Sequence, residues 1–421
     1  MARHHGPASG IPAARSRPES PDHADEGAPM GRAAASAGLP DADFLAVETQ
    51  LSPRERLKLA EVREFLDREV VRHAAQWWNR EEFPHHLLGQ LGELGISTPT
   101  RHGYSHLFHG LVIAELSRAD ASLATFFMIH HDLFVESLHD FGTDRQRALY
   151  LEDAAALRTT GAFALTEPDH GSDVARGMET TARRDGDEWV LNGRKRWIGN
   201  GTFCDHMLLW AQDADSREVR GFVLDTSLPG FSATRIENKI ALRTVQNADI
   251  VLENVRVSEL DRFPGIDSFA DTNQLLRSSR IMVGWVAVGQ QLAAFDVARD
   301  YVLERRQFGR PLASFQLVQQ QLVQMLGNAT ASLAMMAQLA TLQSGGREDM
   351  PQAALAKSFT TLRMRETVAT GRALLGGNGI VTDRRMAKIF ADAEAIFTYE
   401  GTYDINSLIV GRAVTGISAF G

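Results

Sequence analysis

Cysteine is almost absent from this chain of 421 residues, in which Cys204 is the only one. A single thiol cannot close a disulfide within the chain, and a zinc site built from several cysteines is not expected either. Independence from disulfides is typical of proteins in a reducing compartment, so we expect a cytoplasmic protein.

Long apolar runs and an excess of basic residues are also missing. The longest apolar run covers residues 281–289, far short of the roughly 20 residues that span a bilayer, so we expect no membrane association. The formal net charge is −9, and the chain therefore lacks the basic character expected of a nucleic-acid-binding protein.

Three widespread catalytic motifs are absent as well. No strand-like segment is followed by G-x-G-x-x-G, and neither G-x-x-x-x-G-K-[ST] nor G-x-S-x-G occurs. Classical nicotinamide binding, P-loop nucleotide hydrolysis and serine-esterase chemistry are therefore not expected.

Residues 1–43 are rich in Pro, Ala, Gly, Ser and Arg and hold few large apolar side chains. Such a segment cannot bury enough surface to offset its ordering entropy, so we predict a disordered tail. Arg3, Arg15 and Arg17 precede the first acidic residue, Glu19, which is a faint sign of a transit peptide, but no apolar stripe accompanies them.

The remaining chain falls into three regions of different periodicity, which together predict an α+β fold. Helical spacing over 44–160 predicts an N-terminal helical domain, with Ser52 and Pro53 at the start of a helix. Short period-two segments over 161–262 predict a middle β-domain, a small antiparallel barrel or sandwich. Long helical patterns over 263–421 predict a bundle of antiparallel helices. The expected strands cover 163–166, 178–183, 189–191, 206–210, 221–224 and 249–257, and the expected bundle helices cover 277–305, 315–342, 351–375 and 383–395.

The first stretch that can carry chemistry is 163–172, where an expected strand runs into a loop broken by a proline. The hydroxyls of Thr166 and Ser172, with free backbone N–H groups around Gly171, suit the polar edge of a flavin or a diphosphate. An ordinary β-turn with a capping serine is the alternative.

The second stretch is 194–200, and the third is 399–404. A strand that presents Trp197 can lay its indole against a planar ring system, although a core tryptophan is the alternative. In the third stretch, Glu400 follows an apolar segment and precedes Gly401, which suits a general base. Read alone, Thr402 or Asp404 could instead cap the last helix and leave Glu400 exposed.

Together these stretches resemble the acyl-CoA dehydrogenase family over nearly the whole chain from about residue 45. Four segments follow in family order, namely 165–168 with 171–173, 304–309, 375–379 and 399–402. The likeness is greatest to the branch of glutaryl-CoA dehydrogenase and the peroxisomal short-chain acyl-CoA oxidases. It implies a helical N-terminal domain, a middle β-domain and a C-terminal four-helix bundle, with FAD bound between them.

The resemblance also implies roles for individual residues. Glu400 is the expected base, Gly401 lies beside the thioester, Arg280 assists CoA binding, and Ser172 reaches both cofactor and substrate. Arg305, Gln316 and the turn Gly376–Gly377 are expected to contact the FAD of a neighbouring subunit, which implies a homo-oligomer, usually a tetramer. The residues expected at the cofactor are Phe163, Leu165, Thr166, Gly171, Ser172, Trp197, Ile198, Gly199, Arg305, Phe308, Gln316, Gly376, Gly377, Thr402 and Asp404.

The implied reaction oxidises the Cα–Cβ bond of an acyl-CoA thioester to the trans-2-enoyl-CoA. Glu400 takes the α-proton, its backbone N–H and an FAD ribose hydroxyl donate to the thioester carbonyl, and flavin N5 is the acceptor for the β-hydride. Some family members place the base near Ser279 instead, but no acidic residue occurs within Arg277–Arg280, which favours Glu400.

Two positions depart from the family pattern. Ala124, a candidate substrate contact, replaces the arginine that holds the distal carboxylate of glutaryl-CoA, so we expect an uncharged short- to medium-chain acyl group. Gly199 stands where most dehydrogenases have a threonine or serine near flavin N5, and its small size is expected to open space for dioxygen, as in the oxidases.

We favour a dehydrogenase that passes electrons to an electron-transfer flavoprotein. The alternatives are an oxidase reoxidised by O2 to give H2O2, a glutaryl-CoA dehydrogenase, a flavin-dependent oxygenase and an inert flavoprotein scaffold. The i, i+4, i+7 spacing of His102, His106 and His109 could gather a metal ion, but Gly103 disfavours a helix there, and we expect no metal site.

Overall fold

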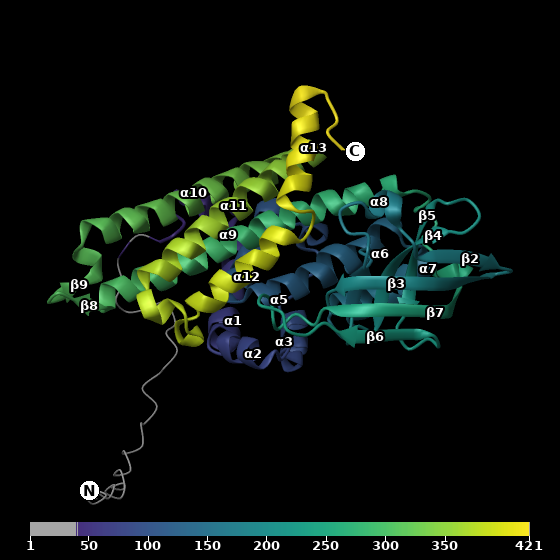
Figure 1. Cartoon of the computed structure of the whole chain (residues 1–421), viewed down its shortest axis with the longest axis horizontal. Coiled ribbons are helices and arrows are strands. Elements are labelled where there is room, and N and C mark those ends of the chain that lie inside the picture. The colour runs from purple at the N-terminus through teal and green to yellow at the C-terminus, as the bar shows by residue number, and fades with distance from the viewer. Residues whose placement is uncertain (1–38, 40, 421) are drawn as a thin grey trace, which may run out of the picture. The chain divides into compact units, whose positions relative to one another are not determined.

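The computed structural model describes residues 39 and 41–420, so most of the predicted tail over 1–43 lies outside the described residues. Helices come first, a sheet follows, and helices return, in the order that the sequence predicts (Figure 1).

The first N-terminal helix begins where its capping residues predict it. In α1 (Pro53–Leu66) the Ser52 hydroxyl accepts from the Glu55 N–H, and the Glu55 carboxylate accepts from the Ser52 N–H. The helices that follow are α2 (Ala74–Arg80), α3 (Leu88–Glu93), α4 (His106–Ala119), α5 (Ala121–Phe127), α6 (Glu136–Phe141) and α7 (Asp144–Ala155). Between α5 and α6 the chain is a π-helix, η6 (Met128–Val135), a form that is often found at functional sites.

The strands form one curled sheet, which has seven strands within the described residues. They are β1 (Gly161–Ala164), β2 (Thr181–Asp185), β3 (Glu188–Ile198), β4 (His206–Asp213), β5 (Val219–Asp225), β6 (Phe231–Arg235) and β7 (Ala248–Ser258), with the short helix α8 (Val174–Gly177) between β1 and β2. The strands pair antiparallel, as predicted, with two exceptions. Strands β1 and β2 both run parallel to β4, which itself pairs antiparallel with β5. Strand β6 is not among the strands that the sequence predicts. In the structure this short segment is only half buried and pairs at the sheet edge with β7.

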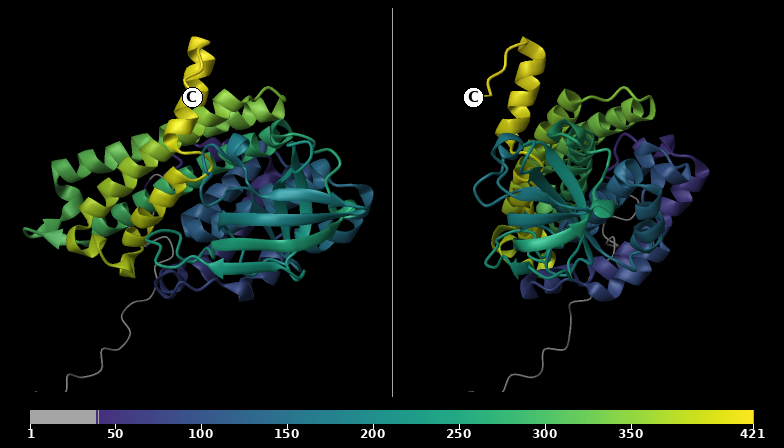
Figure 2. Two further views of the ribbon diagram at one scale, coloured as in Figure 1. Left: turned by 45° about the vertical axis from the view of Figure 1, so that its right-hand side comes forward. Right: turned by 90° about the vertical axis from the view of Figure 1, so that its right-hand side faces the viewer.

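Side chains on the two faces of the sheet pack into different hydrophobic cores, because successive residues of a strand point to opposite faces. Along β4, Met207 and Leu209 join one cluster of buried residues, whereas Leu208 and Trp210 join another that also holds Phe134 of η6. Helices therefore cover the second face (Figure 2). A third and larger core joins the N-terminal helices to the C-terminal bundle.

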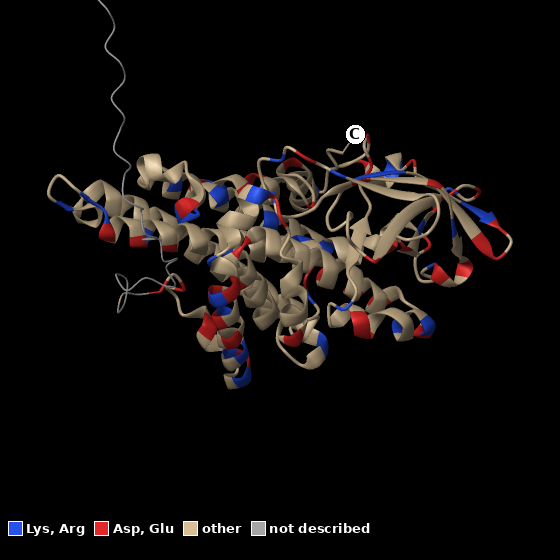
Figure 3. Ribbon diagram, turned by 90° about the horizontal axis from the view of Figure 1, so that it is seen from below, with Lys and Arg blue, Asp and Glu red and all other residues tan. Residues whose placement is uncertain are grey.

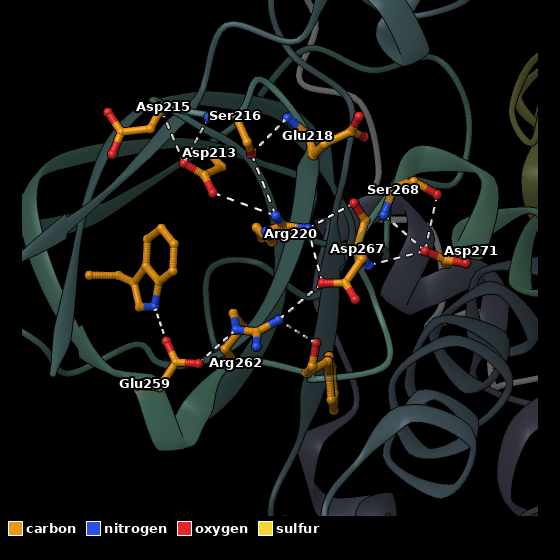
Figure 4. Close-up of polar contacts among 12 residues, drawn as sticks. Asp213, Asp215, Ser216, Glu218, Arg220, Glu259, Arg262, Asp267, Ser268 and Asp271 are labelled. Atoms are coloured by element: carbon orange, nitrogen blue, oxygen red, sulfur yellow. Dashed lines mark hydrogen bonds and ion pairs between the residues drawn. The ribbon is translucent and has the colours of Figure 1, made fainter.

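An ion-pair network fastens the sheet to the segment that leads into the bundle (Figure 4). Arg220 of β5 donates to the Asp267 carbonyl at 2.7 Å and to its carboxylate at 3.0 Å. The Asp267 carboxylate also lies 3.5 Å from the Arg262 guanidinium, and the Asp271 carboxylate accepts from the Asp267 N–H at 3.0 Å.

The bundle is built around α9 (Asn273–Glu304), in which every residue from Ser279 to Phe295 is buried. Around it lie α10 (Gln316–Ser344), α11 (Met350–Leu374) and α12 (Met386–Thr398), followed by α13 (Tyr403–Thr415), and a small hairpin of β8 (Arg306–Gln307) and β9 (Arg310–Pro311) follows α9. Among the described residues, the helix Phe269–Glu304 is the one long and apolar enough to cross a membrane. Since 89% of its most apolar window is buried inside the protein, it has the character of a core helix.

Helices α4 and α9 cross closely because glycines face each other's helix. A Cβ at Gly110 of α4 would lie 2.0 Å from the Trp285 ring of α9, and one at Gly289 of α9 would lie 2.2 Å from the Ala114 carbonyl oxygen of α4. On the face seen in Figure 3, acidic and basic residues are interspersed along the helices.

Candidate active site

A cavity of about 1190 Å³ lies where the N-terminal helices, the sheet and the bundle meet. Thr125 of α5 and Met128, Ile129 and Leu133 of η6 line it on one side. The other walls come from the loop after β1, the end of β3, the 239–247 loop, and helices α9, α12 and α13. The π-helical segment therefore carries lining residues that the sequence analysis did not single out.

The Glu400 carboxylate reaches this cavity from a tight turn between α12 and α13. Glu400 and Gly401 both have left-handed backbones, with φ of 55° and 78°. A glutamate in this conformation is strained and persists only where its surroundings hold it, which is common at functional sites. Thr402 then caps α13, accepting from the Ile405 N–H at 3.3 Å, so one helix ends and another begins around Glu400.

Polar groups surround the Glu400 side chain. The Ser279 hydroxyl of α9 donates to Glu400 Oε2 at 2.7 Å. The neighbouring Arg280 donates to the Leu276 carbonyl at 2.8 Å and to the Asn406 side chain at 3.1 Å. Burial lowers the pKa of Arg280, and the charge of Glu400 opposes that shift. The carboxylate is thus fixed by a neutral donor, with a cation nearby.

Trp197 enters the cavity through a bulge in β3. The register with β7 is interrupted between Lys195 and Ile198, and Trp197 takes a left-handed backbone with φ of 65°. Its indole is 52% exposed, and the Arg196 guanidinium lies 4.9 Å from the ring centroid. The bulge therefore turns a large aromatic face out of the sheet and towards the cavity.

The loop after β1 is held by a buried ion pair. Lys195 of β3 donates to the Leu165 carbonyl at 3.0 Å and to the Glu167 carboxylate at 2.8 Å. Glu167 also accepts from the N–H groups of Glu179 and Thr180. Burial lowers the pKa of Lys195 to about 8, while Glu167 raises it. These contacts fix the backbone beside Thr166.

Twelve of the residues singled out from the sequence meet at this cavity. They are Phe163, Leu165, Thr166, Gly171, Ser172, Trp197, Ile198, Gly199, Arg280, Glu400, Gly401 and Thr402. Segments far apart in the chain thus converge as the family resemblance implies, although their individual roles stay predictions.

The other predicted residues lie outside the lining of this cavity. Ala124 is fully buried in α5 but does not line it, and Thr125 does so instead. The helix turns the Ala124 side chain into the core, so the structure brings Thr125, and not Ala124, to the cavity, and a substrate contact at Ala124 stays a prediction. Asp404 is exposed on α13.

A second group of predicted residues lies at or near the far end of the bundle, close to the β8–β9 hairpin (Figure 1). Arg305 follows α9, Phe308 is 92% exposed, and Gln316 begins α10. Gly376 and Gly377 form a turn after α11, whose Asn378 donates to the Tyr301 hydroxyl of α9 at 2.9 Å. None of these residues lines the cavity of their own chain.

The space beside Gly199 is not open. A Cβ at Gly199 would lie 2.3 Å from Cδ1 of Ile129, so the Ile129 side chain fills the room that a threonine or serine would need. The expectation that Gly199 opens this part of the cavity is therefore corrected, because a residue distant in sequence supplies the missing volume.

The histidines of α4 do not gather into a metal site within the described residues. His109 Nε2 lies 2.9 Å from the Asp132 carboxylate, and both are buried. Burial is the largest single effect and lowers the pKa of His109, but the charge and hydrogen bond of Asp132, with the charge of Glu136, outweigh it and raise the pKa above its usual value.

Two lysines at or beside the cavity are not among the residues predicted from the sequence. Lys239 donates to the Leu242 carbonyl at 2.9 Å and to the Asn247 side chain at 2.7 Å, which ties down the 239–247 loop. Lys357 of α11 is fully buried next to the Glu400 turn. No sequence signal marks Lys239, whereas Lys357 is a charged residue on the apolar side of a helical pattern.

Three consecutive segments of the chain match the three domains of one enzyme family. Residues 52–158 match the acyl-CoA dehydrogenase N-terminal domain, residues 162–255 the middle domain and residues 269–415 the C-terminal domain. The chain belongs to the acyl-CoA dehydrogenase family. The predicted fold class and the family resemblance are thereby confirmed.

Similar proteins span nearly the whole length of this acyl-CoA dehydrogenase family member. A probable acyl-CoA dehydrogenase of Bacillus subtilis, YngJ, is 30% identical over 377 residues, which are 86% of this chain and 98% of the relative. Two structures of glutaryl-CoA dehydrogenase from Mycobacterium smegmatis, one in complex with FADH2, have TM-scores of 0.87 at 34% and 30% identity. They cover 90% and 91% of this chain and 100% of each neighbour. Butyryl-CoA dehydrogenase from Megasphaera elsdenii has a TM-score of 0.83 at 26% identity, covering 87% of this chain and 99% of the neighbour.

The acyl-CoA dehydrogenase family binds FAD, and the cavity fits such a group. Its volume of about 1190 Å³ is above the roughly 300–1,000 Å³ of ordinary ligand pockets. The exposed indole of Trp197 offers a face for a planar ring, and the loop of Thr166 and Ser172 offers hydroxyls. The cavity therefore has both the room and the donors for a flavin beside a thioester.

Proposed function

We propose that this protein catalyses the FAD-dependent α,β-dehydrogenation of an uncharged acyl-CoA, with Glu400 as the base that removes the α-proton. The observation that carries the proposal is the Glu400 carboxylate, which a strained left-handed turn presents to the cavity and the Ser279 hydroxyl orients at 2.7 Å. Such orientation places a proton acceptor at a defined point, which general-base catalysis requires.

The chain's own groups supply the proton transfer and the binding. Glu400 accepts the α-proton, and its backbone N–H donates to the thioester carbonyl, which stabilises the charge that develops on oxygen. Arg280 and the hydroxyl of Ser172 contribute to holding the thioester and the cofactor. Bound FAD, held by the loop of Thr166 and by Trp197, would supply the acceptor for the two electrons and the β-hydrogen.

Apolar walls support an uncharged acyl group. Met128, Ile129, Leu133 and Val245 line the cavity on the side of η6 and the 239–247 loop. That loop holds two cations. Lys239 lines the cavity, and its ammonium group is occupied by carbonyl and amide oxygens. Arg243 is paired with Glu81. A distal carboxylate would therefore lose its hydration without gaining a free cation there.

The decisive experiment follows the visible spectrum of the purified flavoprotein under nitrogen. Butyryl-CoA or hexanoyl-CoA should bleach the flavin, while glutaryl-CoA should act far more slowly. Glu400→Gln should retain the flavin and lower the bleaching rate by about 10³-fold, because the amide cannot accept the proton.

The matched comparison is Glu394→Gln. Glu394 also lines the cavity, but its carboxylate accepts from Arg365 at 2.8 Å. A much smaller loss is expected there. Unchanged bleaching by Glu400→Gln, or a preference for glutaryl-CoA, would refute the proposal.

An oxidase is the second candidate because of Gly199. The contact between Gly199 and Ile129 supports a dehydrogenase, since the apolar side chain fills the space that dioxygen would use. We therefore propose an electron-transfer flavoprotein as the electron acceptor. Admitting air after anaerobic bleaching distinguishes the two: slow return of the yellow colour is expected, and rapid return with stoichiometric H2O2 would favour the oxidase.

A homotetramer in the cytoplasm is part of the same proposal. Arg305, Phe308 and Gln316 lie outside the cavity of their own chain, where a neighbouring subunit's cofactor would give them a role. Light scattering of the holoenzyme measures the assembly directly, and a stable monomer that retains FAD would count against it.

A further inference from the structure

Three lysines within the described residues are nearly fully buried: Lys195, Lys357 and Lys388. Lys195 is paired with Glu167, and Lys388 is paired with Asp120 and Asp392. Lys357 differs, because its two hydrogen bonds go to backbone carbonyls, those of Phe397 and Gly401, each at 2.8 Å. A buried ammonium group that donates to carbonyls alone is costly, so its position calls for a reason.

The two carbonyls lie on either side of Glu400. Phe397 belongs to the last turn of α12, where carbonyls have no partner within the helix, and a cation there is favourable. Gly401 directly follows Glu400 and shares its left-handed conformation. Lys357 thus joins the end of α12 to the far side of the turn that carries the base.

A second clamp acts on the same turn from α13. The Asn406 side chain donates to the Gly401 carbonyl at 2.8 Å and to the Thr402 carbonyl at 3.0 Å. Asn406 in turn accepts from Arg280. The Gly401 carbonyl therefore receives hydrogen bonds from both Lys357 and Asn406, which restricts the backbone next to Glu400.

We propose that Lys357 is a positioning residue of the base: its ammonium group holds the turn from Phe397 to Gly401 in the strained conformation that presents the Glu400 carboxylate to the cavity. The inference rests on the proposed function for its kinetic consequences, but its structural content is independent of substrate.

The charges around Lys357 give the proposal a dependence on pH. Burial lowers the pKa of Lys357 to about 7, the charge of Glu400 raises it, and Arg280 of α9 lowers it. On α12, Glu394 is already paired with Arg365, and Lys388 and Asp392 are paired with each other. Below about pH 7 the ammonium group is charged and the clamp is strong, whereas above that pH the proton leaves and the clamp weakens.

The test compares Lys357→Met, which removes the charge, with Lys357→Arg, which keeps it. The readout is the rate of anaerobic flavin bleaching by butyryl-CoA and its isotope effect with α-dideuterated substrate. We expect Lys357→Met to retain flavin and to bleach about tenfold to a hundredfold more slowly. The isotope effect should rise, because proton abstraction limits the rate more strongly. Lys357→Arg should recover part of the rate.

The pH profile gives a signature that a merely structural role would not produce. In the unmodified protein the bleaching rate should fall as pH rises through about 7, since Lys357 loses its proton. Lys357→Arg should remove this fall, because a guanidinium stays charged. The matched control is Thr367→Val, a buried position further along α11 whose hydroxyl donates to the Arg363 carbonyl at 2.8 Å and accepts from the Asn328 side chain at 3.2 Å. It should lower the unfolding midpoint without changing the profile.

A crystal structure of Lys357→Met separates this inference from the proposed function. If the Glu400–Gly401 turn keeps its left-handed geometry and its contact with Ser279, Lys357 does not position the base. Equal behaviour of Lys357→Met and Thr367→Val in bleaching would overturn the inference as well. Failure of the unmodified flavoprotein to bleach would instead refute the proposed function, and the turn geometry would still decide the role of Lys357. If Lys357→Met does not fold, the pH profile of Lys357→Arg decides.

Discussion

At the scale of single residues, the shape of the cavity depends on side chains that fill the space left by small residues elsewhere in the chain. Ile129 Cδ1 occupies the place of a side chain at Gly199. Ile129→Ala should therefore open the cavity beside Gly199 and cost about 1–3 kcal/mol of unfolding free energy. Reoxidation of the substrate-reduced flavin by air should become several-fold faster, as followed by stopped-flow absorbance.

The control for this change is Ile380→Ala, because Ile380 is 71% exposed and lies outside the cavity lining. It should alter neither the stability nor the reoxidation. If Ile129→Ala reoxidises at the unmodified rate, the side chain is not what excludes dioxygen.

At the scale of helices and strands, the close crossing of α4 and α9 is the feature most sensitive to substitution. Gly110→Ala places a methyl group against the Trp285 ring and should destabilise the protein by about 1–3 kcal/mol.

Gly327→Ala tests a glycine with open space around it, since Gly327 is exposed in α10 with no atom within 4 Å of its added Cβ. This second change should stabilise by about 0.5–1 kcal/mol through helix propensity. Urea unfolding midpoints measure the effect of each substitution, and a shift of both midpoints in the same direction would contradict the packing argument.

Periodicity and capping predicted most of these elements, because they are local properties. The capping box at Ser52 and the four long bundle helices follow from the sequence directly. The π-helix η6 and the parallel pairing at β4 do not, since both depend on contacts between distant segments. For the same reason the motifs located Glu400 and Trp197, whereas Ile129 and Lys357 emerged only from the packed structure.

At the scale of the whole molecule, one buried carboxylate joins all three regions. Asp392 of α12 accepts from the Trp78 indole N–H of α2 at 2.8 Å and from the Leu242 N–H of the cavity loop at 2.6 Å. Its other oxygen accepts from Lys388 at 2.8 Å. Asp392→Asn removes one of the two carboxylates that balance Lys388, so we expect a loss of about 2–4 kcal/mol of unfolding free energy, measured by urea unfolding.

The control is Asp153→Asn, where the carboxylate pairs with Arg158 at the surface and both side chains are about half exposed. Little change is expected there, since exposed ion pairs contribute little. A similar small effect of Asp392→Asn would mean that the three regions do not depend on this carboxylate.

The assembly offers a second prediction at this scale. Phe308 is 92% exposed at the tip of the β8–β9 hairpin, in which Arg306 pairs with Pro311. Phe308→Ser should weaken association and lower FAD retention while leaving the unfolding of the single chain unchanged. Light scattering and the ratio of flavin to protein absorbance measure the two effects, and an intact oligomer with full flavin content would contradict it.

The contact between Gly199 and Ile129 also constrains how such a site can evolve. A larger residue at 199 clashes while Ile129 is present, and a smaller residue at 129 leaves a void while Gly199 is present. Across descendants of such a protein the two positions should therefore change as a pair.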